Sequence, residues 1–168
     1  MVKQVFLPIL AVVAFIVIVG IFSQKSGFFR LTNMIGAQLT PTLQKTVTIG
    51  TKTINVQVAD TEENREKGLS GVTSLDANGG MLFIFNSQNV SPVFWMKGML
   101  IPLDFIWIKD GRIIRIDKNV PKPAENTPDN KLKMYSAGQP VDYVLEVNAG
   151  FSDSNSIKVK DVVSISGI

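Results

Sequence analysis

The stretch Phe105-Ile106-Trp107-Ile108-Lys109-Asp110-Gly111-Arg112-Ile113-Ile114-Arg115-Ile116 decides the fold class of this chain. Asp-Gly between two apolar runs is a strong hairpin signal, because the favoured two-residue turn needs positive φ angles at both positions. Isoleucine and aromatic residues on either side are typical of strands. The sequence therefore predicts a β-hairpin with arms at 105–108 and 112–116.

Other strands are expected on both sides of this hairpin. Alternating polar and β-branched residues predict an N-terminal hairpin with arms at 46–49 and 53–58, joined at Gly50-Thr51-Lys52. Two near-continuous apolar runs, 81–85 and 93–96, predict strands that are covered on both faces. Two more strands are expected toward the C-terminus, at 143–147 and 162–166.

Helix signals are few and short. Asp60 with Glu63 three residues later forms a capping-box pattern before a short helix at 61–67, and Gly68 is suited to the C′ position. Residues 76–80 form a turn cluster, and 148–155 are expected to hold one helical turn. Many short strands with one or two short helices indicate an α+β class: a compact, β-dominated domain, compatible with a partly closed mixed β-barrel.

The N-terminal segment 5–22 contains no charged residue. As a helix it would extend about 27 Å, close to the roughly 30 Å hydrocarbon core of a bilayer. We interpret residues 1–24 as a single-pass transmembrane anchor, 25–45 as a tether and 46–168 as the globular domain. A cleaved signal peptide is the alternative, although the apolar run is long for one and no Ala-x-Ala site follows. The short N-terminal tail places the domain outside the cytoplasm, although flanking positive charges are nearly balanced.

The composition excludes several classes of chemistry. The chain has no cysteine and no histidine, which excludes disulfides, thiol nucleophiles, Ser-His-Asp catalysis and the usual zinc sites. Acid–base chemistry is left to carboxylates, lysine or tyrosine. Of 17 basic residues, Lys3, Lys25 and Arg30 precede position 45, so the part of the chain from Lys45 onward holds 14 basic and 14 acidic residues. We therefore expect no nucleic-acid partner, no metal and no cofactor.

Several motifs resemble one known family. They are Val58-Ala59-Asp60-Thr61 with Arg65 and Gly68-Leu69, Gly80-Met81-Leu82-Phe83, Phe94-Trp95-Met96-Lys97 with Ile101-Pro102-Leu103-Asp104, Asn119-Val120-Pro121, and Tyr143-Val144-Leu145-Glu146-Val147-Asn148-Ala149-Gly150. Over residues 46–166 the chain resembles the domain of unknown function 192 family. The resemblance implies a small β-rich domain, often behind a signal or anchor, with no established activity. Gly98-Met99 replaces the common Asn-Thr, and residues 122–134 lack the cysteines of many members.

The segment from Trp95 to Asp104 is the first candidate site. If 93–97 and 104–108 formed a hairpin, Lys97 and Asp104 would be its closing pair, with Cβ atoms about 5 Å apart. This polar pair beside the Trp95 indole would suit a sugar or another ring. The alternative is a structural ion pair with Trp95 in the core.

Four more residues are candidate ligand contacts. Arg65 would bind an anion through its planar guanidinium, or else attach the helix to the sheet. Glu146 is expected away from the main core, where it would pair with Lys97 or Arg65 or serve as an acid. Asn119 begins a proline-rich stretch, 119–140, and Tyr135 lies near its end; this stretch is either a functional lid or a solvated loop.

Three functions follow from these expectations. The first is a membrane-anchored extracytoplasmic domain, held by residues 5–22, that binds or assists a cell-envelope component. The second is a hydrolase of envelope polysaccharide that uses Asp104 and Glu146 as its two carboxylates. This requires them in a cleft, about 5–5.5 Å apart for a retaining enzyme or about 6.5–9.5 Å apart for an inverting one. The third is a structural or assembly module. The sequence does not indicate an oligomeric state.

Overall fold

The hairpin around Asp110-Gly111 forms one end of the sheet in the computed structural model, which describes residues 44–85 and 90–168. Strands β4 (Leu103–Lys109) and β5 (Arg112–Val120) pair antiparallel across this turn. Asp110 and Gly111 have φ angles of 49° and 67°. Two positive φ angles are what the primed two-residue turn needs, so the prediction is confirmed together with its physical reason.

The described strands form one seven-stranded sheet in the order β5-β4-β6-β3-β2-β1-β7. The remaining strands are β1 (Thr46–Ile49), β2 (Lys52–Ala59), β3 (Gly79–Ile84), β6 (Tyr143–Asn148) and β7 (Val163–Ser166). Strands β2 and β3 pair parallel, and every other neighbouring pair is antiparallel. The connection between the two parallel strands carries helix α3 (Glu62–Lys67).

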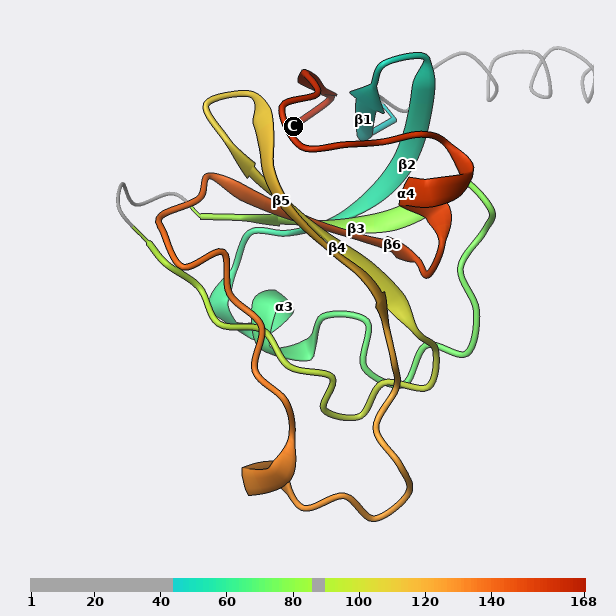
Figure 1. Cartoon of the computed structure of the whole chain (residues 1–168), viewed down its shortest axis with the longest axis vertical. Coiled ribbons are helices and arrows are strands. Elements are labelled where there is room, and N and C mark those ends of the chain that lie inside the picture. Colours follow the sequence, from blue (N-terminus) through green and yellow to red (C-terminus); the bar gives the residue numbers. More distant parts are fainter. Residues whose placement is uncertain (1–43, 86–89) are drawn as a thin grey trace, which may run out of the picture. The chain divides into compact units, whose positions relative to one another are not determined.

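The sheet curls into a half-barrel (Figure 1). This agrees with the β-dominated, partly closed architecture expected from the sequence. Its two ends approach each other where β5 begins and β7 is about to begin. An isolated bridge joins Arg112 to Val162, and the Val163 amide donates to the Gly111 carbonyl at 2.9 Å. The hairpin turn is therefore tied to the C-terminal strand.

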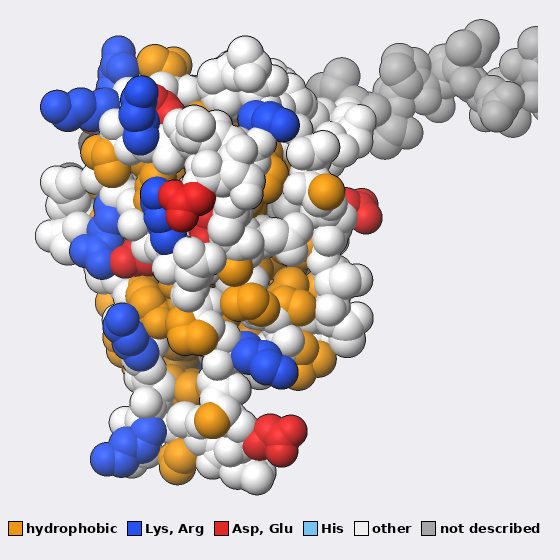
Figure 2. All heavy atoms as spheres, turned by 45° about the vertical axis from the view of Figure 1, so that its right-hand side comes forward, with side chains coloured by type: hydrophobic (Ala, Val, Ile, Leu, Met, Phe, Trp, Pro, Cys, Tyr) orange, Lys and Arg blue, Asp and Glu red, His pale blue; other side chains and the backbone are white. Residues whose placement is uncertain are grey.

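Both faces of the central strands are covered. One face packs residues of β1, β2, β4, β6 and β7 against helix α4 (Phe151–Ser154). The opposite face packs Phe83, Phe105 and Trp107 with side chains of the segments that follow α3, β3 and β5, among them Leu69, Met96, Met99 and Tyr135. Two-sided burial explains why the apolar runs at 81–85 and 105–108 do not alternate. Figure 2 shows apolar side chains that remain visible between charged ones in the lower half of one face.

The short helices lie close to their predicted places. Thr61 is the N-cap of α3, and its hydroxyl accepts from the Asn64 amide at 3.2 Å, so the expected cap at Asp60 is displaced by one residue. Thr61 is the residue with the extended backbone that an N-cap needs. Gly68 ends the helix with a φ of 49°. The turn cluster at 76–80 is shorter than predicted, because Gly79 and Gly80 already belong to β3.

The predicted strand at 93–96 is wrong. This segment contacts its neighbour through one isolated bridge, in which Phe94 and Tyr135 exchange two backbone hydrogen bonds of 2.8 Å. The expected hairpin partner, β4, already has β5 on one edge and β6 on the other. No free edge of β4 remains for 93–96, so the segment instead lies over the face of the sheet.

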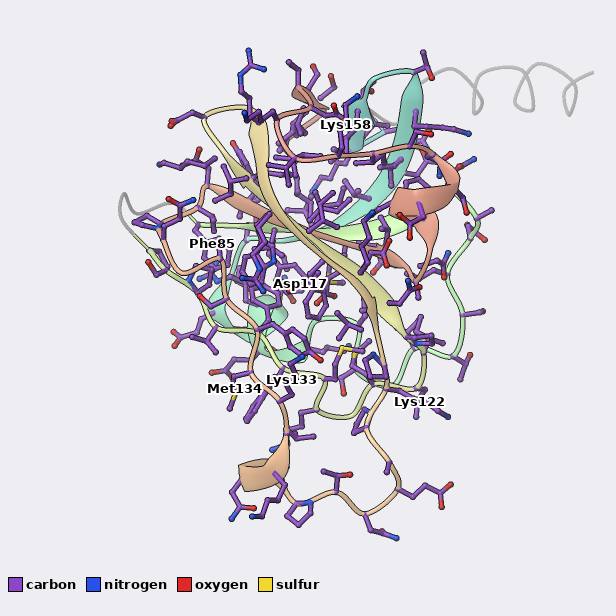
Figure 3. The ribbon with its side chains drawn as sticks, in the orientation of Figure 1. Phe85, Asp117, Lys122, Lys133, Met134 and Lys158 are labelled. Atoms are coloured by element: carbon purple, nitrogen blue, oxygen red, sulfur yellow. The ribbon has the colours of Figure 1, made fainter. Side chains whose placement is uncertain are left out.

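The connection from β5 to β6 runs below the sheet as a long loop with a short 3-10 helix, η1 (Asp129–Lys131). Lys122 lies on one limb of this loop, and Lys133 and Met134 lie on the other (Figure 3). The predicted anchor at 5–22 and nearly all of the predicted tether lie outside the described residues. Within the described part, no helix is long and apolar enough to cross a membrane.

Candidate functional site

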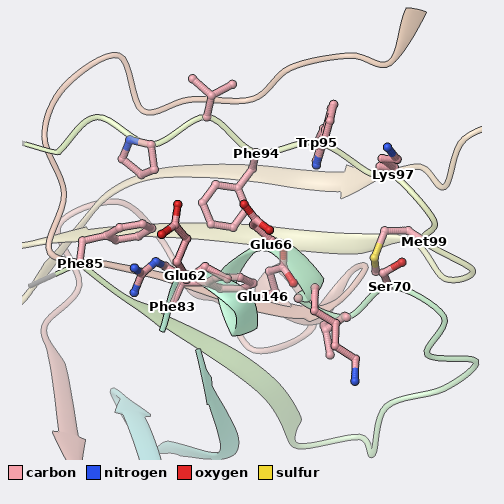
Figure 4. Close-up of a pocket in the computed structure, with 16 residues that line it drawn as sticks. Glu62, Glu66, Ser70, Phe83, Phe85, Phe94, Trp95, Lys97, Met99 and Glu146 are labelled. Carbon is pink, nitrogen blue, oxygen red and sulfur yellow. The ribbon is translucent and has the colours of Figure 1, made fainter. Parts of the chain in front are cut away.

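A cleft of about 830 Å³ lies between α3 and the segment 92–99, on the face of the sheet formed by β3 and β6. Its apolar lining is aromatic in large part: Phe83, Phe85, Phe94 and Trp95. Its polar lining comes chiefly from α3, with Glu146 at the sheet (Figure 4). Ligand sites in proteins have this volume and this mixture of apolar walls with a few polar groups.

Glu146 is the most unusual residue of the cleft. It stands on β6 between β3 and β4, opposite Met81 on one side and Phe105 on the other. The side chain is only 4% exposed, and its Oε2 atom has no hydrogen-bond partner among the described residues. A buried polar atom without a partner is rare and costly. The expectation that Glu146 points away from the core is therefore wrong, because both faces of β6 are covered.

Burial also changes the protonation of Glu146. Desolvation penalises the charged carboxylate and raises the pKa of Glu146 from 4.5 to about 8. At neutral pH the carboxyl group is mostly protonated. It can then both donate and accept a hydrogen bond at the cleft.

Arg65 lines the cleft but is held by the fold. Its Nη1 donates to the carbonyl oxygens of Asp60 at 2.6 Å and Ile84 at 3.1 Å, and its guanidinium lies 5.8 Å from the ring centroid of Phe85. These contacts attach α3 to β3. Arg65 therefore has the second of its two predicted roles, attachment of the helix to the sheet.

Trp95 and Lys97 lie together at the rim. The Lys97 ammonium is 5.3 Å from the Trp95 ring centroid and forms a 2.6 Å ion pair with Asp129 of η1. Trp95 is 41% exposed, so its ring offers a surface to a ligand. The predicted Lys97–Asp104 pair is wrong, because 93–97 does not pair with β4.

Asp104 is fully buried and serves the fold. Its Oδ1 accepts from the Asn119 and Gly150 amides at 2.8 and 3.0 Å, and its Oδ2 accepts from the Ser152 amide at 2.9 Å. Asp104 pairs with Val147 in the register, whereas Glu146 pairs with Phe105. Opposed residues share a face and successive ones alternate, so Asp104 and Glu146 lie on opposite faces. They cannot form the two carboxylates of a hydrolase site.

Asn119 and Tyr135 also lie outside the cleft lining. Asn119 adopts a φ of 52° at the end of β5, where its amide reaches Asp104. Tyr135 packs edge-on against Phe105 with ring centroids 5.4 Å apart, and burial raises the pKa of its hydroxyl. Both residues therefore hold the loop to the sheet. Of the seven predicted site residues, the cleft brings together Arg65, Trp95, Lys97 and Glu146.

A family model, domain of unknown function 192, described as "Uncharacterized ACR", matches residues 45–165. The chain belongs to the domain of unknown function 192 family. No curated protein matches the sequence.

Two solved structures resemble this member of the family. A protein of Sinorhizobium meliloti 1021, described as a "putative transcription regulator", is 27% identical with a TM-score of 0.63; the match covers 73% of this chain and 92% of that one. A protein of unknown function from Novosphingobium aromaticivorans DSM 12444 is 32% identical with a TM-score of 0.62; the match covers 72% and 83%.

The Gly98-Met99 departure from the family pattern falls beside the cleft. Gly98 has a φ of 68°, and a Cβ atom added to it would lie 2.2 Å from the Ser70 hydroxyl oxygen. Ser70 and Met99 both line the cleft. A side chain at position 98 would therefore displace Ser70, so these residues shape one end of the site in this chain.

The sequence did not reveal the carboxylates of α3 or the aromatic wall. Glu62 and Glu66 line the cleft, as do Phe83, Phe85 and Phe94. Their four-residue spacing places Glu62 and Glu66 on one side of the helix. This spacing could have predicted from the sequence that the two carboxylates face the same way. The three phenylalanines had the pattern of ordinary core residues.

Proposed function

We propose that this domain is a binding module that holds a small, polar, ring-bearing ligand of the saccharide class in the cleft between α3 and residues 92–99. The observation that carries the proposal is the buried Glu146 carboxyl, which lines the cleft with one oxygen unpartnered among the described residues. A group buried in this way is explained if a ligand supplies the missing hydrogen bond.

The cleft walls suit such a ligand. The exposed Trp95 ring offers a flat apolar surface, and Glu146 offers both a donor and an acceptor when protonated. If residues 5–22 anchor the chain and the domain lies outside the cytoplasm, the ligand belongs to the cell envelope. The equal numbers of basic and acidic residues from Lys45 onward favour such a ligand over nucleic acid. The concave site likewise favours binding over a purely structural role.

Three β-1,4-linked disaccharides test the proposal: cellobiose, N,N′-diacetylchitobiose and the diamine made of two glucosamine units. Each is titrated into the full-length protein in a mild detergent and followed by amide NMR. We expect saturable shifts in residues 62–70 and 92–99 with at least one disaccharide. Trp95→Ala should weaken binding about tenfold or more through loss of the ring surface.

The matched control is Val159→Ala, which shortens another exposed apolar side chain that does not line the cleft. This variant should bind like the parent protein. Absence of saturable shifts with all three disaccharides, or equal binding by the Trp95→Ala variant, would count against a saccharide site here.

A further inference from the structure

Three acidic side chains line the cleft. Glu62 and Glu66 lie one turn apart on α3, and Glu146 faces the same cleft from β6. Within residues 44–85 and 90–168, none of the three takes part in an ion pair or a side-chain hydrogen bond. The cleft therefore presents three acidic groups to whatever enters it (Figure 4).

The cations of the same cleft are mostly engaged elsewhere. Arg65 donates to the Asp60 and Ile84 carbonyls, and Lys97 pairs with Asp129. None of these three partners lines the cleft. Lys67 is the remaining basic residue of the lining, and it lies in the last turn of α3, where a cation is stabilised by the helix carbonyls.

The aromatic wall has the complementary chemistry. Aromatic faces attract cations, and two rings of this wall already do so within the protein: Phe85 with Arg65 and Trp95 with Lys97. Phe94 packs edge-on against Phe83, with ring centroids 4.8 Å apart, and both rings line the cleft. Aromatic faces attract an organic ammonium group, and acidic side chains can give it charge-assisted hydrogen bonds.

We propose that the ligand of this cleft carries an ammonium group, which binds between Glu146 and Glu66 beside the aromatic wall. This inference rests on the proposed function and narrows its ligand to an amine-bearing saccharide. An ammonium would give the unpartnered Glu146 oxygen a charge-assisted hydrogen bond. Within the described residues no group of three or more His, Cys, Asp or Glu side chains could hold a metal ion.

The test compares the same three disaccharides at pH 7, since they differ in having hydroxyl, acetamido or ammonium groups. We expect the diamine to bind at least about tenfold more tightly than cellobiose, the size of one charge-assisted contact. Glu66→Gln should reduce this preference severalfold. Glu66 is exposed, so its substitution should leave the fold intact. Glu146→Gln should reduce the preference further.

Glu63→Gln is the matched control, because Glu63 lies on the same helix but does not line the cleft. It should leave the preference unchanged. Equal affinity for the diamine and cellobiose, or equal effects of Glu63→Gln and Glu66→Gln, would overturn the amine inference while leaving saccharide binding in place. Failure of all three disaccharides to bind would remove both proposals.

Discussion

Replacing Asp104 by alanine is expected to lower the free energy of unfolding by about 3–5 kcal/mol, because three backbone donors lose their acceptor. These amides belong to Asn119, Gly150 and Ser152, and Asp104 itself is fully buried. A buried donor without an acceptor costs roughly 1–3 kcal/mol. Urea unfolding of the full-length protein, followed by tryptophan fluorescence, measures the change.

The Asp104 carboxylate also takes the part of a capping side chain at the N-terminus of α4. Gly150 is the N-cap of α4 and has no side chain to accept from the first helical amides. Asp104 on β4 instead accepts from the amides of Gly150 and Ser152, so one residue joins a strand, the end of β5 and the start of a helix. The effect of its loss should therefore include the detachment of α4 from the sheet.

Asp129→Ala is the matched control for Asp104→Ala. Asp129 also accepts a close contact, from Lys97 at 2.6 Å, but both side chains are more than half exposed. Exposed ion pairs contribute about 0–1 kcal/mol. If Asp104→Ala costs no more than this control, the view of Asp104 as the central structural carboxylate is wrong.

The second large effect is a loss of stability as the pH rises from about 4.5 to 8. Glu146 has a pKa of about 8 in the folded protein against 4.5 ordinarily, so the folded state binds more protons than the unfolded state in this range. Its contribution is complete below 4.5 and is lost as the pH passes 8. The interval corresponds to roughly 5 kcal/mol.

Comparison with Glu146→Gln isolates this contribution, because the variant has no proton to lose. The charged neighbours in the cleft are Glu62, Arg65, Glu66 and Lys67 of α3 and Lys97, and all of them remain in the variant. From β3 and β4, the residues opposite Glu146 are apolar. Parallel stability curves for the two proteins between pH 4.5 and 8 would show that Glu146 is not the buried acid described here.

The sheet was largely predictable because its signals are local. Asp110-Gly111 carries its own turn geometry, and the runs at 81–85 and 105–108 show two-sided burial directly. The segment 93–96 has the same apolar composition, yet it forms no strand. Whether this segment forms a strand depends on whether β4 has a free edge. That is a property of the whole sheet and cannot be inferred from the residues of the segment.

The site was predictable only in part, for the same reason. Trp95 and Glu146 were selected for their chemistry, and the fold brings both to one cleft. Asp104 was selected on equal grounds, but the register turns it to the opposite face, where backbone amides bind it. Glu146 shares its strand face with Asp142 and Val144. Whether that face is covered depends on the elements packed over it, so the burial of Glu146 could not be inferred from its neighbours in sequence.

The most direct test of the account is a carbon-13 NMR titration of the Glu146 carboxyl group in the full-length protein, with Glu146→Gln used to assign the signal. The account predicts a midpoint near pH 8, because the group is buried in the cleft with one oxygen unpartnered among the described residues. The midpoint should fall when the diamine disaccharide is added, since an ammonium favours the carboxylate. A midpoint near 4.5 without ligand would show a hydrated, ordinary carboxylate and would contradict the central claim.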